Sequence, residues 1–147
     1  MKLYVILLLY PVVCYAQLDF TPLCIGDRLK TVYKQCMEEA GVSKADVTDF
    51  IDQKPAQNEL AKCFRACVLT ECNMMDENGN FKRNSAFEMA ENFSTGQISE
   101  IKIIENVANM CLQNIPHATM GRCQKAEDFF MCTSEMCKTH YCFIYLQ

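Results

Sequence analysis

The placement of cysteines constrains this chain more than any other feature of its sequence. The 147 residues include 11 cysteines, and ten of them lie between Cys24 and Cys142. A set that large would fix how distant segments meet if it formed disulfides. The eleventh, Cys14, lies at the end of an N-terminal apolar run. Removal of that run leaves an even number, which can pair completely in an oxidising compartment. The count therefore favours a secreted, disulfide-linked domain.

The N-terminus has the pattern of a cleavable secretory signal. Lys2 precedes the apolar run 3–13, which is followed by a small-residue pattern that closes at Ala16. The run is shorter than the roughly 18 apolar residues of a membrane-spanning helix, and no later stretch approaches that length. We therefore expect residues 1–16 to be a signal peptide and residues 17–147 to be one extracellular domain without membrane insertion.

Helical periodicity dominates the rest of the chain. Apolar side chains recur at three- and four-residue steps, the spacing of one face of an amphipathic helix. Ser43 with Asp46 forms a capping box, and Asn58 is a capping residue, so helices are expected to begin there. No segment alternates convincingly with the period of a strand, so the expected fold is an all-α, six-helix bundle. The expected helices cover residues 25–41, 43–51, 58–73, 86–93, 98–112 and 121–136.

The fifth of these helices has two further expected features. Ser94 with Gln97 forms a second capping pattern at its start. Its apolar residues cover more than one stripe of the helix, which predicts burial on two sides. They are Ile98, Ile101, Ile103, Ile104, Val107, Ala108, Met110, Cys111 and Leu112.

No convincing metal site is present in the sequence. Residues 76–80 form a turn in which Gly79 can take a positive φ, but the oxygen ligands of a calcium-binding loop are not in register. A zinc site has an acceptable spacing, although an oxidising compartment favours disulfides over zinc ligation. Its ligands would be Cys132, Cys137, His140 and Cys142. We expect neither a metal nor a cofactor.

Six of the cysteines have a distinctive spacing. From Cys36 the gaps are 26 residues to Cys63, three to Cys67, 43 to Cys111, 11 to Cys123 and eight to Cys132. This pattern resembles the six-cysteine signature of the insect odorant-binding proteins, the pheromone-binding and general odorant-binding family. Residues 75–81 look like that family's loop ahead of its fourth helix. The resemblance covers essentially the whole chain after the signal, and it implies a helical domain that encloses an apolar ligand cavity.

Spacing alone leaves the pairing of these six cysteines open. Cys63 and Cys67 lie one turn apart on one helix face and point the same way, so geometry argues against a bond between them. The resemblance implies that the first cysteine pairs with the third, the second with the fifth and the fourth with the sixth. The implied bridges are Cys36–Cys67, Cys63–Cys123 and Cys111–Cys132.

Four further cysteines depart from the plain family pattern. Cys24, Cys72, Cys137 and Cys142 can form two more bridges. One option joins Cys24 to Cys72 and Cys137 to Cys142. The other fastens the C-terminal tail to Cys24 or Cys72. The sequence does not choose between them.

The resemblance implies a carrier of small hydrophobic ligands such as odorants or pheromones, working in the aqueous fluid around sensory neurons. Disulfides agree with this role, because they limit the freedom of helices to close in on a cavity. An odorant receptor and a second copy of the chain are the macromolecular partners to consider. The candidate pocket residues are Leu29, Val68, Met75, Phe87, Met89, Ile101, Ile104, Val107, Phe130, Phe143 and Tyr145.

The tail after Cys132 bears on the mechanism. In some relatives a long C-terminal segment enters the pocket at low pH, whereas in others a shorter tail forms part of the pocket wall. Here the tail is short, contains Cys137 and Cys142, and has Glu135 as its only side-chain acid. We therefore expect a wall or lid rather than a helix that exchanges with ligand.

Two other features are open at this stage. His117 and His140 could make ligand release pH-dependent, since histidine changes charge near pH 6.5, but solvent-exposed histidines are the simpler interpretation. Asn92 opens an N-glycosylation sequon, Asn-Phe-Ser, beside an expected helix end.

Other functional classes fit less well. The formal net charge is −4 and the basic residues are scattered singly, which argues against nucleic acid as a partner. A secreted phospholipase would need a helix histidine next to paired cysteines, and no Gly-x-Ser-x-Gly or His-Glu-x-x-His pattern occurs. We expect no enzyme activity. The alternatives that keep the fold are a carrier in saliva, venom or reproductive fluid, and a module that docks on a receptor or partner.

Overall fold

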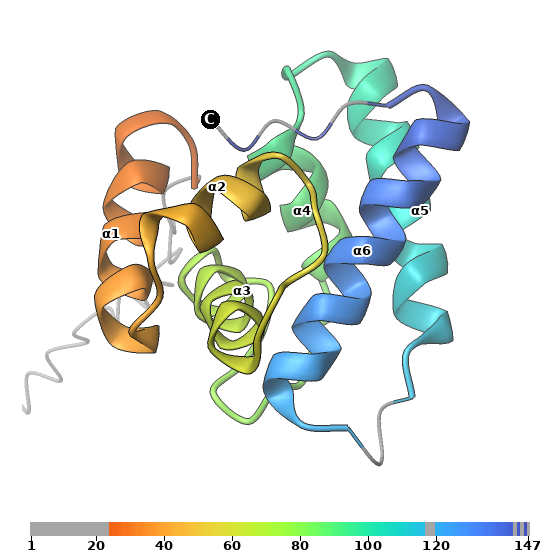
Figure 1. The fold of residues 1–147 in the computed structure, drawn as a ribbon. Helices are drawn as coiled ribbons and strands as arrows, with labels where there is room; N and C mark the ends of the chain where they lie inside the picture. Colours follow the sequence, from red (N-terminus) through yellow and green to blue (C-terminus); the bar gives the residue numbers. More distant parts are fainter. Residues whose placement is uncertain (1–23, 117–119, 143, 145, 147) are drawn as a thin grey trace, which may run out of the picture.

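The computed structural model describes residues 24–116, 120–142, 144 and 146. The expected signal peptide, the domain boundary at Ala16, His117, Phe143 and Tyr145 therefore lie outside the described residues. The described part confirms an all-α fold of six helices (Figure 1), and none of these helices is long and apolar enough to cross a membrane. The helices are α1 (Gly26–Ala40), α2 (Lys44–Ile51), α3 (Glu59–Glu71), α4 (Ser85–Phe93), α5 (Ile98–Asn114) and α6 (Arg122–His140).

Local signals explain where α2 and α3 begin. The Ser43 side chain accepts a hydrogen bond from the backbone N–H of Asp46, and the Asp46 carboxylate accepts one from the Ser43 N–H, which completes the expected capping box of α2. The Ser43 hydroxyl also donates to the Asp46 carboxylate at 2.6 Å, and this bond, with the one from the Ser43 N–H, holds the pKa of Asp46 below its usual value. The Asn58 side chain caps α3 by accepting from the Ala61 N–H at 2.8 Å.

Both expectations for α5 are wrong. The helix begins after Gln97 without a side-chain cap, because the Ser94 hydroxyl accepts instead from the Gly96 N–H within the preceding turn. Ile104 and Val107 are buried, but Ile98 is 73% exposed and Ile103 38% exposed. One face of α5 therefore packs on the bundle, and the other meets solvent.

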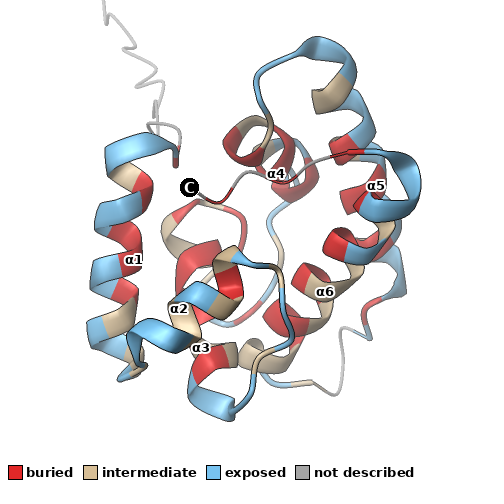
Figure 2. Ribbon diagram, turned by 45° about the horizontal axis from the view of Figure 1, so that its top comes forward, coloured by how far each residue is buried: buried red, intermediate tan, exposed pale blue. Residues whose placement is uncertain are grey.

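The helices pack in a connected series around a shared apolar centre. α3 lies at the middle, in contact with α1 on one side and α6 on the other, while α5 contacts both α6 and α4. Figure 2 shows the buried faces of the helices turned inward and the exposed faces turned outward. The tail after α6 returns across the end of the bundle toward α1 and α2 (Figure 1).

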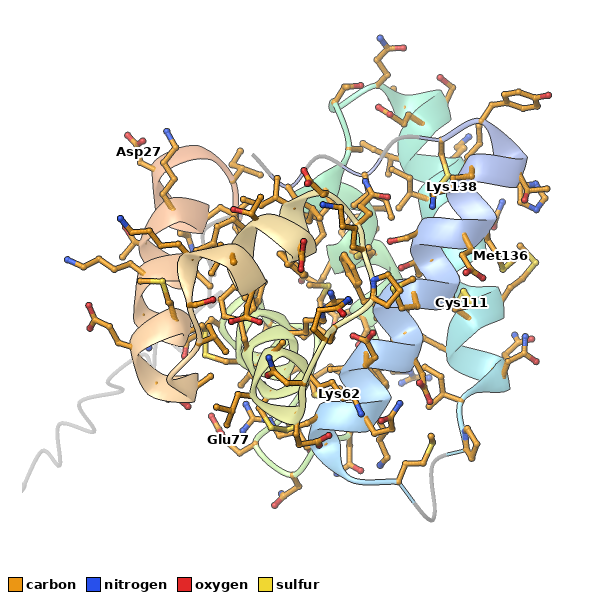
Figure 3. All side chains as sticks on the ribbon, in the orientation of Figure 1. Asp27, Lys62, Glu77, Cys111, Met136 and Lys138 are labelled. Carbon is orange, nitrogen blue, oxygen red and sulfur yellow. A yellow bond between two sulfur atoms is a disulfide. The ribbon has the colours of Figure 1, made fainter. Side chains whose placement is uncertain are left out.

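Five disulfides join these elements. The structure contains the three bridges that the resemblance implies, Cys36–Cys67 between α1 and α3, Cys63–Cys123 between α3 and α6, and Cys111–Cys132 between α5 and α6. Figure 3 shows Cys111 on α5 where that helix faces α6. Of the two options for the remaining cysteines, the structure has Cys24–Cys72 and Cys137–Cys142.

The turn in the loop between α3 and α4 is held by hydrogen bonds within the loop. The Asp76 carboxylate accepts hydrogen bonds from the backbone N–H groups of Asn80 and Asn78, and the Asn80 bonds are the main reason that its pKa is lowered. A carboxylate occupied in this way is a turn element rather than a calcium ligand. Gly79 has φ of 78°, and an added Cβ would lie 2.7 Å from Cβ of Arg122. Only glycine suits this position, where the loop meets the start of α6.

Candidate ligand-binding site

Most of the candidate pocket residues come together in the apolar centre of the bundle. Ile101 is partly buried and packs against the same cluster. Phe87 is 43% exposed on α4 and does not join the others. The remaining described candidates are all buried in the cluster, and they are Leu29, Val68, Met75, Met89, Ile104, Val107 and Phe130.

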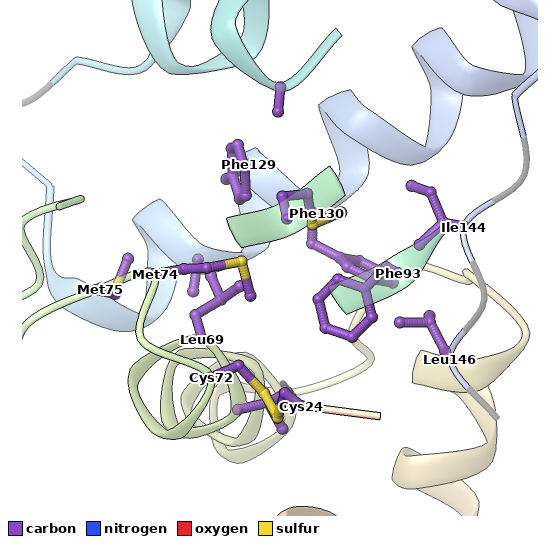
Figure 4. Close-up of a cluster of buried hydrophobic side chains, with 14 of the residues drawn as sticks. Cys24, Leu69, Cys72, Met74, Met75, Phe93, Phe129, Phe130, Ile144 and Leu146 are labelled. Carbon is purple, nitrogen blue, oxygen red and sulfur yellow. A yellow bond between two sulfur atoms is a disulfide. The ribbon is translucent and has the colours of Figure 1, made fainter. Parts of the chain in front are cut away.

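Sequence reasoning missed several side chains of this cluster. Phe93 of α4 is buried, as are Ile144 and Leu146 of the tail. Figure 4 shows these three side chains facing one another, with Phe130 of α6 nearby. The helical spacing of α4 includes Phe93, so that signal was available. Ile144 and Leu146 are two residues apart in the tail, as buried residues of an extended segment would be. The residues next to Ile144 are apolar too, so the sequence does not show an alternation of apolar and polar side chains.

An aromatic group forms one part of the cluster. The rings of Phe50 and Phe130 stack with their centroids 4.6 Å apart. Phe64 meets Phe50 edge to face at 5.5 Å, and Tyr33 does the same at 5.7 Å. Edge-to-face and offset contacts of this kind are the favoured geometries of aromatic pairs. The group joins α1, α2, α3 and α6 through side chains alone.

A buried ion pair lies beside these rings. Nη1 of Arg65 on α3 is 2.7 Å from Oε2 of Glu127 on α6, and the two side chains are 1% and 9% exposed. Oε1 of Glu127 also accepts from the Ala56 N–H at 3.0 Å. The guanidinium lies 4.5 Å from the centroid of Phe130. Burial lowers the pKa of Arg65, and the charge of Glu127 opposes that effect. The pair joins α3, α6 and the loop before α3.

The C-terminal tail is held against the bundle at its backbone. The Cys137–Cys142 bridge fixes the point where the chain leaves α6. Nε2 of Gln53 donates to the Ile144 carbonyl at 3.1 Å, and the Tyr33 hydroxyl donates to the Leu146 carbonyl at 2.8 Å. Burial raises the pKa of Tyr33, so its hydroxyl remains a donor across the physiological range. The tail thus covers one end of the apolar centre.

Two other expected features lie elsewhere. His140 is exposed at the end of α6, where it lines a groove of about 500 Å³ with Ile103, Val107 and Met110 of α5. Asn92 is buried at 3% exposure, and its Oδ1 accepts from the Cys24 N–H at 2.6 Å. A glycan requires a solvent-exposed amide, so the folded protein does not accommodate one on Asn92.

The cysteines of the possible metal-ligand sets are committed to disulfides. Within the described residues, Glu59, Cys63 and Cys123 lie close enough to share an ion, but the two sulfurs are bonded to each other. The zinc set considered from the sequence is also occupied, because Cys132 is bonded to Cys111 and Cys137 to Cys142. The apolar centre is therefore the candidate ligand site, since sites for small organic molecules are lined mainly by apolar and aromatic side chains.

The fold and the site together define a disulfide-linked helical carrier of small ligands. The chain belongs to the PBP/GOBP family, whose model matches residues 25–136. Proteins of this family are binding carriers and not enzymes.

Individual relatives agree with this assignment. General odorant-binding protein 28a of Drosophila melanogaster is 27% identical over 108 residues, which cover 73% of this chain and 73% of that protein. The solved structure of odorant-binding protein 28a from the same fly has a TM-score of 0.67 at 26% identity, covering 77% of this chain and 92% of that one. A pheromone-binding protein from the cockroach Leucophaea maderae, solved with a fluorescent reporter, shares the fold with a TM-score of 0.64 at 16% identity, covering 74% and 92% of the two chains.

Proposed function

We propose that this protein binds small, mostly apolar organic molecules such as odorants or pheromones and carries them through an extracellular aqueous fluid. The observation that carries the proposal is the apolar centre covered by the tail, where Ile144 and Leu146 lie against Phe93 and Phe130. Relatives named as general odorant-binding proteins support the choice of ligand. The proposed pocket wall consists of the buried candidates together with Phe93, Ile144 and Leu146.

The physical basis for binding is the transfer of apolar surface from water. Each square ångström of ligand surface buried contributes about 25 cal/mol, and a few polar groups suffice to orient a ligand in such a pocket. Met75 and Met89 in the proposed wall have flexible thioether side chains that can repack around different shapes. A carrier of this design accepts a range of apolar molecules.

We further propose that the tail acts as a wall or lid of the pocket. The described residues of the tail are held by the hydrogen bonds from Gln53 and Tyr33, which can break and re-form without unfolding the helices. Both buried tail side chains point into the cluster (Figure 4) and would contact a ligand there.

Deleting residues 143–147 is expected to weaken the binding of a fluorescent apolar probe at least about tenfold, because the loss of two buried aliphatic side chains exceeds 1.4 kcal/mol. Titration of the purified, oxidised protein with phenylnaphthylamine measures this. Tyr33→Phe, which removes one tether and keeps the side chain volume, is the control and should change the affinity far less. Equal affinity of the truncated and full-length proteins, with the helical circular dichroism unchanged, would exclude a role for the tail in binding.

Secretion is part of the same proposal. Cleavage after Ala16 removes Cys14 and leaves ten cysteines, the number that the five disulfides use. Native mass spectrometry of the protein from the medium of secreting cells should therefore show a chain that begins at Gln17 and carries no free thiol. A retained N-terminus or a chain with reactive thiols would contradict the proposed processing.

Two alternatives keep the fold and change the role. A carrier in saliva, venom or reproductive fluid would share every feature described above, and the tissue of expression distinguishes it from an olfactory carrier. A module that docks on an odorant receptor or pairs with a second copy would not need ligand. Failure of the delipidated protein to bind any apolar probe would favour that docking role.

A further inference from the structure

A surface cleft next to the tail has features that the carrier proposal does not use. It has a volume of about 340 Å³ and lies between the end of α2, the last turns of α6 and the tail. Its lining includes Gln53 from the turn after α2, Ser134 and Lys138 from α6, and Ile144 from the tail. Figure 3 shows Lys138 near the end of α6, on the side where the tail passes. The volume is within the range of small-molecule sites.

Ser134 is the unusual residue of this cleft. It is fully buried, and its hydroxyl has no hydrogen-bond partner within the described part of the chain. A serine in a helix commonly bonds to the carbonyl four residues earlier, here that of Phe130. The hydroxyl of Thr133 already donates to that carbonyl at 2.9 Å. A buried hydroxyl without a partner destabilises the fold, so a ligand oxygen that bonds to it would recover that free energy.

The other polar groups around the cleft are mainly donors. Lys138 has no carboxylate at ion-pair distance among the residues the structure describes. Gln53 uses one N–H of its amide on the Ile144 carbonyl and keeps the other. The acid at the rim, Asp52, is already paired with Lys54, whose Nζ lies 2.9 Å from its Oδ2. Lys54 is shared with Asp49, so the charges around the cleft balance. Lys138 and the second N–H of Gln53 are nevertheless donors without a partner among the described residues, and they favour a ligand group that is anionic and accepts hydrogen bonds.

The cleft also adjoins the apolar centre. Ile144 lines the cleft and belongs to the buried cluster. An apolar chain with a polar end could therefore place the end in the cleft and the chain against Ile144. The Cys137–Cys142 bridge fixes the other wall of the cleft, and because the Ser134 hydroxyl is fully buried, a side chain lining the cleft must shift for a ligand oxygen to reach it.

We propose that this cleft is a subsite for the carboxylate end of an apolar ligand, such as a fatty acid, with Ser134 and Lys138 as its hydrogen-bond and charge partners. The inference rests on the proposed carrier function and specifies its ligand class. A carboxylate held by Lys138 and bonded to the Ser134 hydroxyl distinguishes a fatty acid from an apolar molecule of the same length without a charge.

The test is displacement of phenylnaphthylamine by lauric acid and by lauryl alcohol, which share one chain length. Ser134→Ala is expected to weaken lauric acid about tenfold, since a hydrogen bond to a charged group contributes roughly 1.5–3 kcal/mol. Lys138→Gln is expected to weaken the acid about two- to fivefold and to leave the alcohol unchanged. Lys102→Gln, at an exposed lysine of α5 outside the cleft, is the matched control and should alter neither.

Each outcome decides the proposal. Ser134→Ala should keep or raise the melting temperature, because the hydroxyl it removes is unpaired; a clear fall would show a structural partner and overturn the subsite. Equal affinities of the wild type and both cleft variants for lauric acid, with the probe bound normally, would also overturn it and leave the carrier function intact. A wild-type protein that binds no probe would overturn the carrier function itself.

Discussion

Replacing Glu127 by glutamine is expected to lower the free energy of unfolding by about 3–5 kcal/mol, the usual cost of leaving one member of a buried ion pair without its partner. Arg65 is 1% exposed, so its charge would be left in a medium that solvates it poorly. Chemical denaturation under non-reducing conditions, followed by circular dichroism, measures the change.

Two further variants make this prediction specific. Glu59→Gln removes the acid of an exposed pair, whose Oε2 lies 3.1 Å from Nζ of Lys62, and is expected to cost less than about 1 kcal/mol. Replacing Arg65 by methionine and Glu127 by leucine together should restore most of the stability, since no charge is then left unpaired. A Glu127 variant as stable as the Glu59 variant would mean that the pair is not buried in solution.

Replacing Cys63 and Cys123 together by serine is expected to lower the free energy of unfolding by about 4 kcal/mol. This bridge closes a loop of 60 residues, the longest of the five separations. In the chain-entropy model, a long loop restricts the unfolded chain most, so its bridge contributes most to stability. Thermal and chemical unfolding of the oxidised variant measure the loss.

The matched comparison is the bridge between Cys137 and Cys142, which spans only five residues. Replacing both of its cysteines by serine should cost about 2 kcal/mol in the same model. Removing this bridge frees the start of the tail, so we expect a marked loss of affinity for the probe beside a small loss in the free energy of unfolding. The opposite ranking of the two double variants would show that native contacts rather than loop length govern the stabilisation.

The features that the sequence predicted well depend either on a few adjacent residues or on the number and spacing of the cysteines. The capping box at Ser43 and the cap at Asn58 depend on a few adjacent residues, and the helix end at Gly41 depends on a single glycine, which takes the αL conformation. Cysteine spacing adds long-range information that no apolar pattern contains, because a bridge joins two segments whatever lies between them.

The features it missed depend on tertiary neighbours. The apolar pattern of α5 is the same whether one or two faces are covered, and only the position of α4 and α6 decides that Ile98 and Ile103 face solvent. Phe87 matches the spacing of its buried neighbours, yet lies on the outer side of a short helix. The Ser94 hydroxyl could accept a hydrogen bond from the N–H of Gln97, which would cap α5, or from the N–H of Gly96. It accepts from Gly96, within the turn before the helix.

The backbone anchoring of the tail has a consequence for how such a carrier can diversify. Gln53 and Tyr33 bind carbonyl groups, which every amino acid supplies, so the tether does not depend on the side chains at 144 and 146. If the proposed pocket wall is right, changes in size and shape at those two positions would alter which ligands fit while the tail stays in place. Substitution there offers a short mutational route to new selectivity that leaves the disulfide scaffold and the helices untouched.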